Sequence, residues 1–154
     1  MKEILTISKD DVTELLQRLL DSFQVIGPVS AEGQVLFKRV SGPEELDLEY
    51  RGHTVLPPKR FFFPEKEVLF TYEKTDDEVR LYDWLEVVEE GRRILIGVRP
   101  CDIASLKCLD KVFMGEYNDP YYEARRRTTV IIGLTCNEPE DYCFCAYTGS
   151  GPYI

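Results

Sequence analysis

Two uninterrupted apolar runs in the C-terminal half constrain the fold more than any other feature of this sequence. Residues 94–98 read ILIGV and residues 129–134 read TVIIGL, and residues 99–128 between them carry helical patterns. Strands that are buried on both faces read as continuous apolar runs, and parallel neighbours need a helical crossover. The pattern predicts an α/β (α+β-like) fold whose C-terminal half is a parallel βαβ unit.

The N-terminal half predicts one helix followed by short strands. Ser8 and Asp11 form a capping pair ahead of apolar residues at helical spacing, which predicts a helix over residues 9–23. Residues 23–29 and 34–40 suggest two strands joined by a glycine turn, and residues 46–48 a short strand in a polar loop. The proline-bracketed run PPKRFFFP predicts an irregular segment that leads into a strand at 67–72 and a turn at 75–78.

Length and charge limit the classes of protein to consider. A chain of 154 residues suits a single domain that covers residues 1–154. A net charge of −9 would repel nucleic-acid phosphates and anionic membranes, so we expect neither as a partner. Acidic residues interrupt the apolar N-terminal segment, which therefore predicts an amphipathic helix rather than a signal peptide. No stretch reaches the roughly 20 apolar residues that cross a bilayer, so we expect a cytoplasmic protein.

The cysteines indicate metal or redox chemistry, because structural disulfides are rare in reducing cytosol. Cys136, Cys143 and Cys145 fall in the run GLTCNEPEDYCFC, and Cys101 follows the first buried strand in GVRPCD. Ligands bind beyond the carboxyl ends of strands in open α/β sheets, so Cys101 and Cys136 could meet there. Four thiolates suit a 4Fe-4S cluster, and the start of a helix at Cys101 would stabilise a thiolate. Cys108, roughly 10 Å further along that helix, is predicted to lie in the core.

Other uses of these residues stay open. Four thiolates also suit zinc, although the paired CxxC motifs usual in zinc sites are absent. With zinc or with no metal, the chain would be an interaction module that docks a partner through exposed residues 61–63. A flavin-binding oxidoreductase domain is the other reading, since Lys59, Arg60 and Arg99 could contact a flavin phosphate or tune a cluster by their charge. Ordinary surface ion pairs are the alternative for these three cations.

Several motifs together resemble a known family. They are GVRPCD, DPYYEARR, GLTCNEP and CFCAYTGSGP, with PPKRFFFPEKEVLF upstream, and they cover the chain from about residue 56 to its end. They look like the N-terminal domain of the beta subunit of sulfhydrogenase-type, cytoplasmic nickel-iron hydrogenases and of the corresponding subunit of anaerobic sulfite reductase. A fainter similarity to the flavin-binding beta subunits of deazaflavin-dependent hydrogenases keeps a flavin open.

The resemblance implies an iron-sulfur electron-transfer subunit that is not catalytic alone. It would relay electrons between a catalytic subunit of a hydrogenase or sulfite reductase and a flavin-containing NAD(P)H diaphorase subunit. It supports Cys101, Cys136, Cys143 and Cys145 as ligands of the cluster. A two-cluster ferredoxin domain follows this region in the family, so we expect the chain to be the N-terminal part of a longer iron-sulfur subunit.

Overall fold

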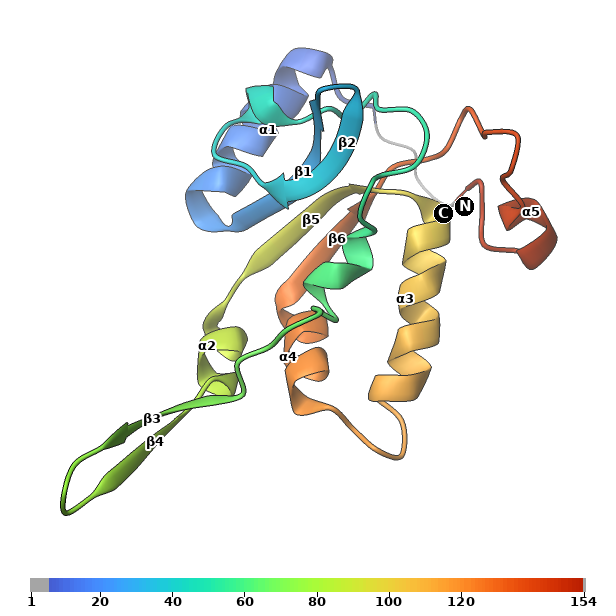
Figure 1. Cartoon of the computed structure of the whole chain (residues 1–154). Helices are drawn as coiled ribbons and strands as arrows, with labels where there is room; N and C mark the ends of the chain where they lie inside the picture. The colour runs from blue at the N-terminus through green and yellow to red at the C-terminus, as the bar shows by residue number, and fades with distance from the viewer. Residues whose placement is uncertain (1–5, 154) are drawn as a thin grey trace.

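The computed structural model describes residues 6–153, which form a mixed β-sheet with helices on both faces (Figure 1). The first half contains α1 (Lys9–Ser22), β1 (Gln24–Ala31), β2 (Gln34–Arg39) and the short 3-10 helices η1 (Pro43–Glu45) and η2 (Pro58–Phe61). The second half contains β3 (Phe70–Lys74), β4 (Val79–Asp83), α2 (Leu85–Glu90), β5 (Arg93–Val98), α3 (Pro100–Phe113), α4 (Pro120–Thr128), β6 (Thr129–Gly133) and α5 (Cys145–Thr148).

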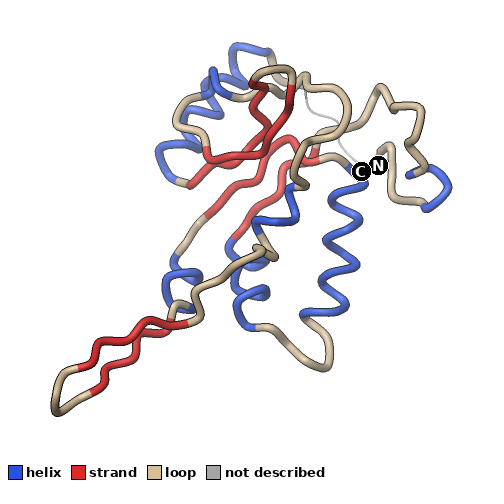
Figure 2. Tube along the Cα trace, in the orientation of Figure 1, coloured by secondary structure: helices blue, strands red, loops and turns tan. Residues whose placement is uncertain are grey.

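The main sheet has the strand order β2-β1-β5-β6. Strands β1 and β2 form the antiparallel hairpin predicted at residues 23–40, and β5 pairs in parallel with both β1 and β6. Helices α3 and α4 connect β5 to β6, as the colouring by secondary structure shows (Figure 2). This arrangement confirms the α/β class and the C-terminal parallel βαβ unit.

Two apolar clusters fix the helices against the two faces of the sheet. On one face, Leu16 of α1 packs with Val25 of β1 and Ile94 of β5. On the other, Leu95 of β5 packs with Leu106 of α3, and the cluster includes residues of α4 and η2. Successive side chains of a strand point to opposite faces, so β5 supplies both clusters and is buried along its length.

Strand β6 differs from the prediction of two fully buried strands. Its burial alternates, and Val130 and Ile132 are 56% and 36% exposed. These two residues pair with Ile94 and Ile96 of β5, which face α1. Because β6 is the edge strand and α1 packs over β1, the outer part of this face has no covering helix among residues 6–153.

The remaining local predictions have mixed outcomes. Helix α1 begins after Ser8, whose side chain accepts a hydrogen bond from the Asp11 backbone N–H, as the capping pair predicts. Residues 46–48 contain no strand, because their backbone follows η1 as a loop that bonds to β1 through Asp47. The strand predicted at 67–72 begins later, at Phe70, and Thr75 and Glu78 close the predicted turn after it. Residues 1–5, the start of the predicted amphipathic segment, lie outside the described residues.

None of the helices in residues 6–153 has the length and hydrophobicity that crossing a bilayer requires.

A partly buried polar cluster lies between α3 and α4. The Arg126 guanidinium donates two hydrogen bonds to the Asp110 carboxylate, at 2.7 and 2.9 Å, and the Tyr122 hydroxyl donates a third at 2.7 Å. Chiefly through Arg126, these bonds hold the pKa of Asp110 below its usual value. A carboxylate with a lowered pKa stabilises the folded state above its unfolded-state pKa and loses that contribution as the pH falls.

We therefore expect Asp110→Asn to flatten the acid side of the stability profile. The wild-type free energy of unfolding should fall as the pH drops below about 4, and the variant should lose part of that dependence. Urea unfolding measured between neutral and acid pH checks this. Parallel curves for wild type and variant would contradict the role given to Asp110.

Candidate functional site

A pocket of about 410 Å³ opens beyond the carboxyl ends of β5 and β6. Residues 50–57 form one wall, the first turn of α3 forms another, and residues 136–152 close the remainder. The four cysteines predicted as ligands line this pocket: Cys101, Cys136, Cys143 and Cys145. They carry free thiols, and none is fully buried. The topology therefore brings together thiols that are up to 44 positions apart in the sequence (145 minus 101).

The two strands position Cys101 and Cys136. The backbone N–H of Leu134 donates to the Val98 carbonyl, which extends the β5–β6 ladder to the edge of the pocket. Cys101 follows in the first turn of α3, and Cys136 follows β6. The Cys136 N–H donates to the Pro152 carbonyl at 3.2 Å and so joins the end of the strand to the closing loop.

Cys143 and Cys145 are held by the turns of the closing loop. The Cys143 N–H donates to the Glu140 carbonyl at 3.0 Å, and the Glu140 N–H donates to the Cys143 sulfur at 3.3 Å. Cys145 begins α5, and a Cβ at Gly151 would lie 3.1 Å from its sulfur and 3.5 Å from the Pro100 Cβ. Glycine at 151 thus lets the end of the loop pass close to Cys145 beside the start of α3.

Arg99 connects all three walls of the pocket. Its guanidinium donates to the carbonyl of Tyr50 and, at 3.4 Å, to the carbonyl of Thr135, and it lies 4.4 Å from the centre of the Tyr50 ring. The Tyr50 hydroxyl in turn donates to the carbonyl of Gly97 at 2.9 Å. Burial, opposed by the Arg99 charge, raises the pKa of Tyr50 to about 12, so this hydroxyl keeps its proton. The guanidinium N–H groups of Arg99 therefore hold the segments that contain Tyr50 and Thr135 in place by donating to their backbone carbonyls.

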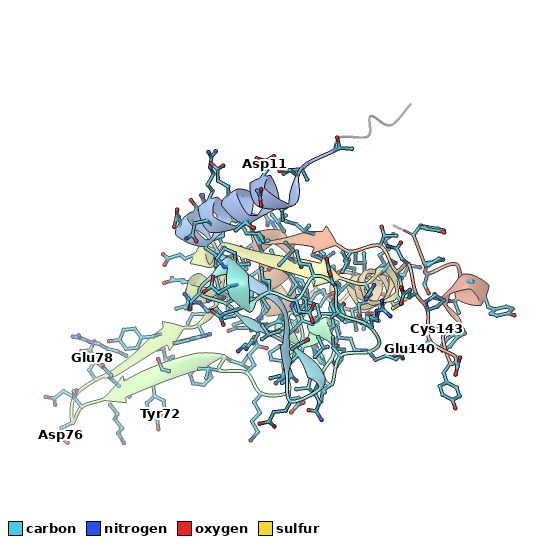
Figure 3. The ribbon with its side chains drawn as sticks, turned by 90° about the horizontal axis from the view of Figure 1, so that it is seen from above. Asp11, Tyr72, Asp76, Glu78, Glu140 and Cys143 are labelled. Carbon is cyan, nitrogen blue, oxygen red and sulfur yellow. The ribbon has the colours of Figure 1, made fainter. Side chains whose placement is uncertain are left out.

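Two contacts between basic and acidic side chains join residues 50–57 to the closing loop. Arg51 lies 2.9 Å from Glu138, and His53 lies 3.4 Å from Glu140. All four side chains are largely exposed, so each pair contributes little to stability by itself. Their position is more important for the site than their contribution to stability, because Glu140 belongs to the turn that holds Cys143 (Figure 3).

The electrostatic environment of Cys101 differs from the sequence prediction. Partial burial raises the pKa of its thiol, and the Asp102 carboxylate adds to this, while backbone N–H groups at the start of α3 oppose it. The neighbouring Cys145 also raises it. Burial likewise raises the pKa of Asp102, against the charges of Lys59 and His53. The backbone N–H groups at the start of α3 thus lower the pKa of Cys101 by less than burial and the neighbouring charges raise it. A metal that binds the Cys101 sulfur must therefore displace the proton of the thiol.

A comparison with known proteins adds a relative. The beta subunit of sulfhydrogenase 2 from Pyrococcus furiosus is 39% identical to this chain over 137 residues, which are 89% of this chain and 38% of that subunit. The chain belongs to the sulfhydrogenase beta subunit family. It spans little more than a third of the length of that relative. No family model matches the sequence, and no solved structure matches it.

Cysteine thiolates, the donor type gathered in this pocket, are used as ligands both by zinc and by a 4Fe-4S cluster. Within the described part of the chain, no three histidine, cysteine, aspartate or glutamate side chains are arranged to hold one metal ion. Zinc draws its ligands to one centre, with sulfur at about 2.3 Å. A 4Fe-4S cluster takes four cysteine thiolates as ligands of several iron atoms.

The other predicted site residues divide between the pocket and the surface outside it. Arg99 lines the pocket, whereas Lys59 and Arg60 are exposed on η2 and do not. Cys108, predicted to be core, is exposed on α3 and lies outside the pocket, because the buried side of that helix is formed by neighbours such as Leu106.

The segment 61–63 is not an exposed docking patch as a whole. Phe62 is fully buried, Phe61 is partly buried, and Phe63, which is exposed, stacks on Phe113 with ring centres 4.7 Å apart. The prolines on either side direct this run into the core below α3, so the predicted docking through residues 61–63 is wrong for Phe62.

Replacing Arg99 tests whether it positions the pocket. Arg99→Leu removes two hydrogen bonds from a charged donor, so we expect a loss of about 2 kcal/mol in the free energy of unfolding. The walls should also separate, with faster loss of any bound metal to a chelator. Arg60→Leu is the matched control, since Arg60 is exposed outside the pocket. Equal stability and chelation rates in both variants would refute this role.

Proposed function

We propose that this chain is an electron-transfer part of an oxidoreductase complex and that Cys101, Cys136, Cys143 and Cys145 hold one 4Fe-4S cluster. The observation that carries the proposal is the convergence of these four thiols on one pocket in a member of a hydrogenase subunit family. Four cysteine thiolates are the usual ligands of such a cluster. When bound, the cluster would supply one-electron redox chemistry.

The residues around the thiols would set how readily an electron is accepted. The N–H of Glu140 donates to the Cys143 sulfur, and hydrogen bonds to ligand sulfurs favour the reduced, more negative state. Reduction of the cluster would be opposed by three carboxylates that line the same pocket and repel added negative charge, those of Asp102, Glu138 and Glu140.

The wider assignment extends the proposal to the complex. We propose that the chain works in the cytoplasm, between a catalytic subunit of the hydrogenase or sulfite reductase type and a flavin-containing NAD(P)H diaphorase subunit. In this proposal residues 1–154 are one domain, the N-terminal part of a longer subunit whose two-cluster ferredoxin domain would carry electrons onward. Substrate chemistry would belong to the partners.

Lys59, Arg60 and Arg99 keep smaller roles in this proposal. The charge of Lys59 acts on Asp102, which borders the thiols, so Lys59 would tune a cluster through that carboxylate. Arg99 would hold the walls rather than bind the cofactor directly. Arg60 lies outside the pocket, which gives little support for a flavin phosphate there.

Metal analysis of anaerobically purified or reconstituted protein tests the proposal. Iron, acid-labile sulfide, zinc and flavin are assayed together with the low-temperature EPR spectrum of the dithionite-reduced protein. About four irons and four sulfides per chain, with a reduced-cluster signal, are expected. Stoichiometric zinc or flavin without iron, after reconstitution, would overturn the proposal in favour of one of the alternatives.

A further inference from the structure

The β3–β4 hairpin projects from the body of the molecule, at the end opposite the cysteine loop (Figures 1 and 3). Every residue of both strands is exposed, and the strands pair only with each other. Its base is fixed, because the Tyr121 hydroxyl lies within hydrogen-bond distance of the Leu69 carbonyl and of the Asp83 carboxylate, at 2.8 and 2.9 Å, and donates its proton to one of them. The hairpin is therefore held in place but left uncovered.

The register of the hairpin divides its side chains into two different faces. Residues directly opposite each other in an antiparallel pair point to the same face. Tyr72 pairs with Leu81, and on the same face Phe70 pairs with Asp83 and Val79 pairs with Lys74, so this face carries four apolar side chains and one charged side chain at each end. The exposed fractions of these apolar side chains are 58% for Phe70, 63% for Tyr72, 56% for Val79 and 68% for Leu81. Figure 3 shows the Tyr72 side chain directed away from the ribbon.

The opposite face is polar and makes its own contacts. Thr71 pairs with Tyr82, and Glu73 pairs with Arg80. The Tyr82 hydroxyl donates to the Glu73 carboxylate at 3.1 Å, and Arg80 lies 3.1 Å from Glu78. A strand pair with one polar and one apolar face is built to bury the apolar one. An isolated two-stranded hairpin is also marginally stable in water, so covering that face would stabilise it.

The charge of the turn and of the whole chain indicates which kind of partner covers the apolar face of the hairpin. The turn of the hairpin carries Asp76, Asp77 and Glu78, and of these only Glu78 has an ion-pair partner in the described part of the chain. The whole chain carries a net charge of −9, so packing against a second copy or an anionic membrane would bring like charges together. A groove bordered by cations on a different polypeptide complements both the apolar face and the acidic turn.

We propose that the apolar face of the β3–β4 hairpin docks in an apolar groove, bordered by lysine or arginine side chains, on another subunit of the oxidoreductase complex. This rests on the proposed function for the identity of the complex. The hairpin thus anchors the chain at the end opposite the thiols, so docking does not occlude the pocket.

Affinity purification from the protein's own host tests the docking, and the probes are the host's hydrogenase-type catalytic subunits and its diaphorase subunit. Tagged wild type, Leu81→Glu and Tyr72→Glu are purified anaerobically, and those subunits are quantified by mass spectrometry. Thr71→Glu is the matched control, because it adds the same charge on the polar face. We expect both apolar-face variants to recover about tenfold less of the partner subunits, and the control to recover wild-type amounts.

Other results would overturn the docking. Equal recovery by Leu81→Glu and wild type would do so, as would a wild type that recovers none of these subunits. A wild-type dimer in sedimentation that Leu81→Glu converts to a monomer would assign the face to a second copy. Iron content, measured on the same samples, separates the two proposals, because hairpin variants should keep it. If the wild type contains no iron but recovers the partner subunits, and Leu81→Glu fails to recover them, the docking is supported and the cluster is refuted.

Discussion

Cys143→Ala is expected to remove most of the iron from the reconstituted protein. Cys143 lines the pocket with the other three thiols, and its sulfur accepts the N–H of Glu140. Without this thiolate one iron of a 4Fe-4S cluster would lack a protein ligand and become open to solvent. The measurement is iron and sulfide per chain after anaerobic reconstitution and desalting, with the EPR signal of the reduced sample.

Cys108→Ala is the control for that variant. Cys108 is an exposed thiol on α3, outside the pocket, so its removal should leave iron and sulfide at the wild-type level. The pair separates ligation at the pocket from adventitious binding of iron by free thiols. If both variants retained the same iron, Cys143 would not be a ligand.

The positions of the thiols followed from the strand pattern. Because β5 and β6 are parallel neighbours, their carboxyl ends lie at one edge of the sheet, so the sequence pattern is enough to predict Cys101 and Cys136 at that edge. Cys143 and Cys145 were assigned through their shared run with Cys136. These arguments needed only local sequence and one topological rule.

The wall at residues 50–57 could not be assigned in this way. Tyr50 reaches the site through a bond to Gly97, a contact between residues 47 positions apart, in a segment that has no periodic pattern. The sequence contains a faint signal for this contact, because the basic residues Arg51 and His53 have the same two-residue spacing as the acidic residues Glu138 and Glu140. Such spacings are common in sequences, so this one does not predict that the two segments meet. Such long-range contacts depend on packing.

The hairpin shows the same limit. The turn at 75–78 was readable, yet β4 was not predicted, because an exposed strand pair lacks the buried apolar run that marks β5. The exposure of Cys108 has a related cause. An apolar or thiol side chain on a helix can face either way, and only the position of the sheet decides which side is covered.

Phe62→Ala is expected to be the most destabilising single change considered. Phe62 is fully buried in the cluster beneath α3 and α4, with the Arg126 guanidinium 5.2 Å from its ring centre. Removing a buried phenylalanine typically costs about 3–5 kcal/mol. In a domain of this size that corresponds to a fall of roughly 6 to 20 °C in the unfolding temperature.

The neighbouring residue makes the comparison decisive. Phe63 is 51% exposed and stacks on Phe113, so Phe63→Ala should cost only about 1 kcal/mol. Chemical denaturation at matched iron content measures both variants without a contribution from cluster loss. If the two cost the same, the proline-bracketed run would not insert Phe62 alone into the core, and the packing of η2 beneath α3 would have to be abandoned. A large gap would show that Phe62 is the residue that anchors this run in the core.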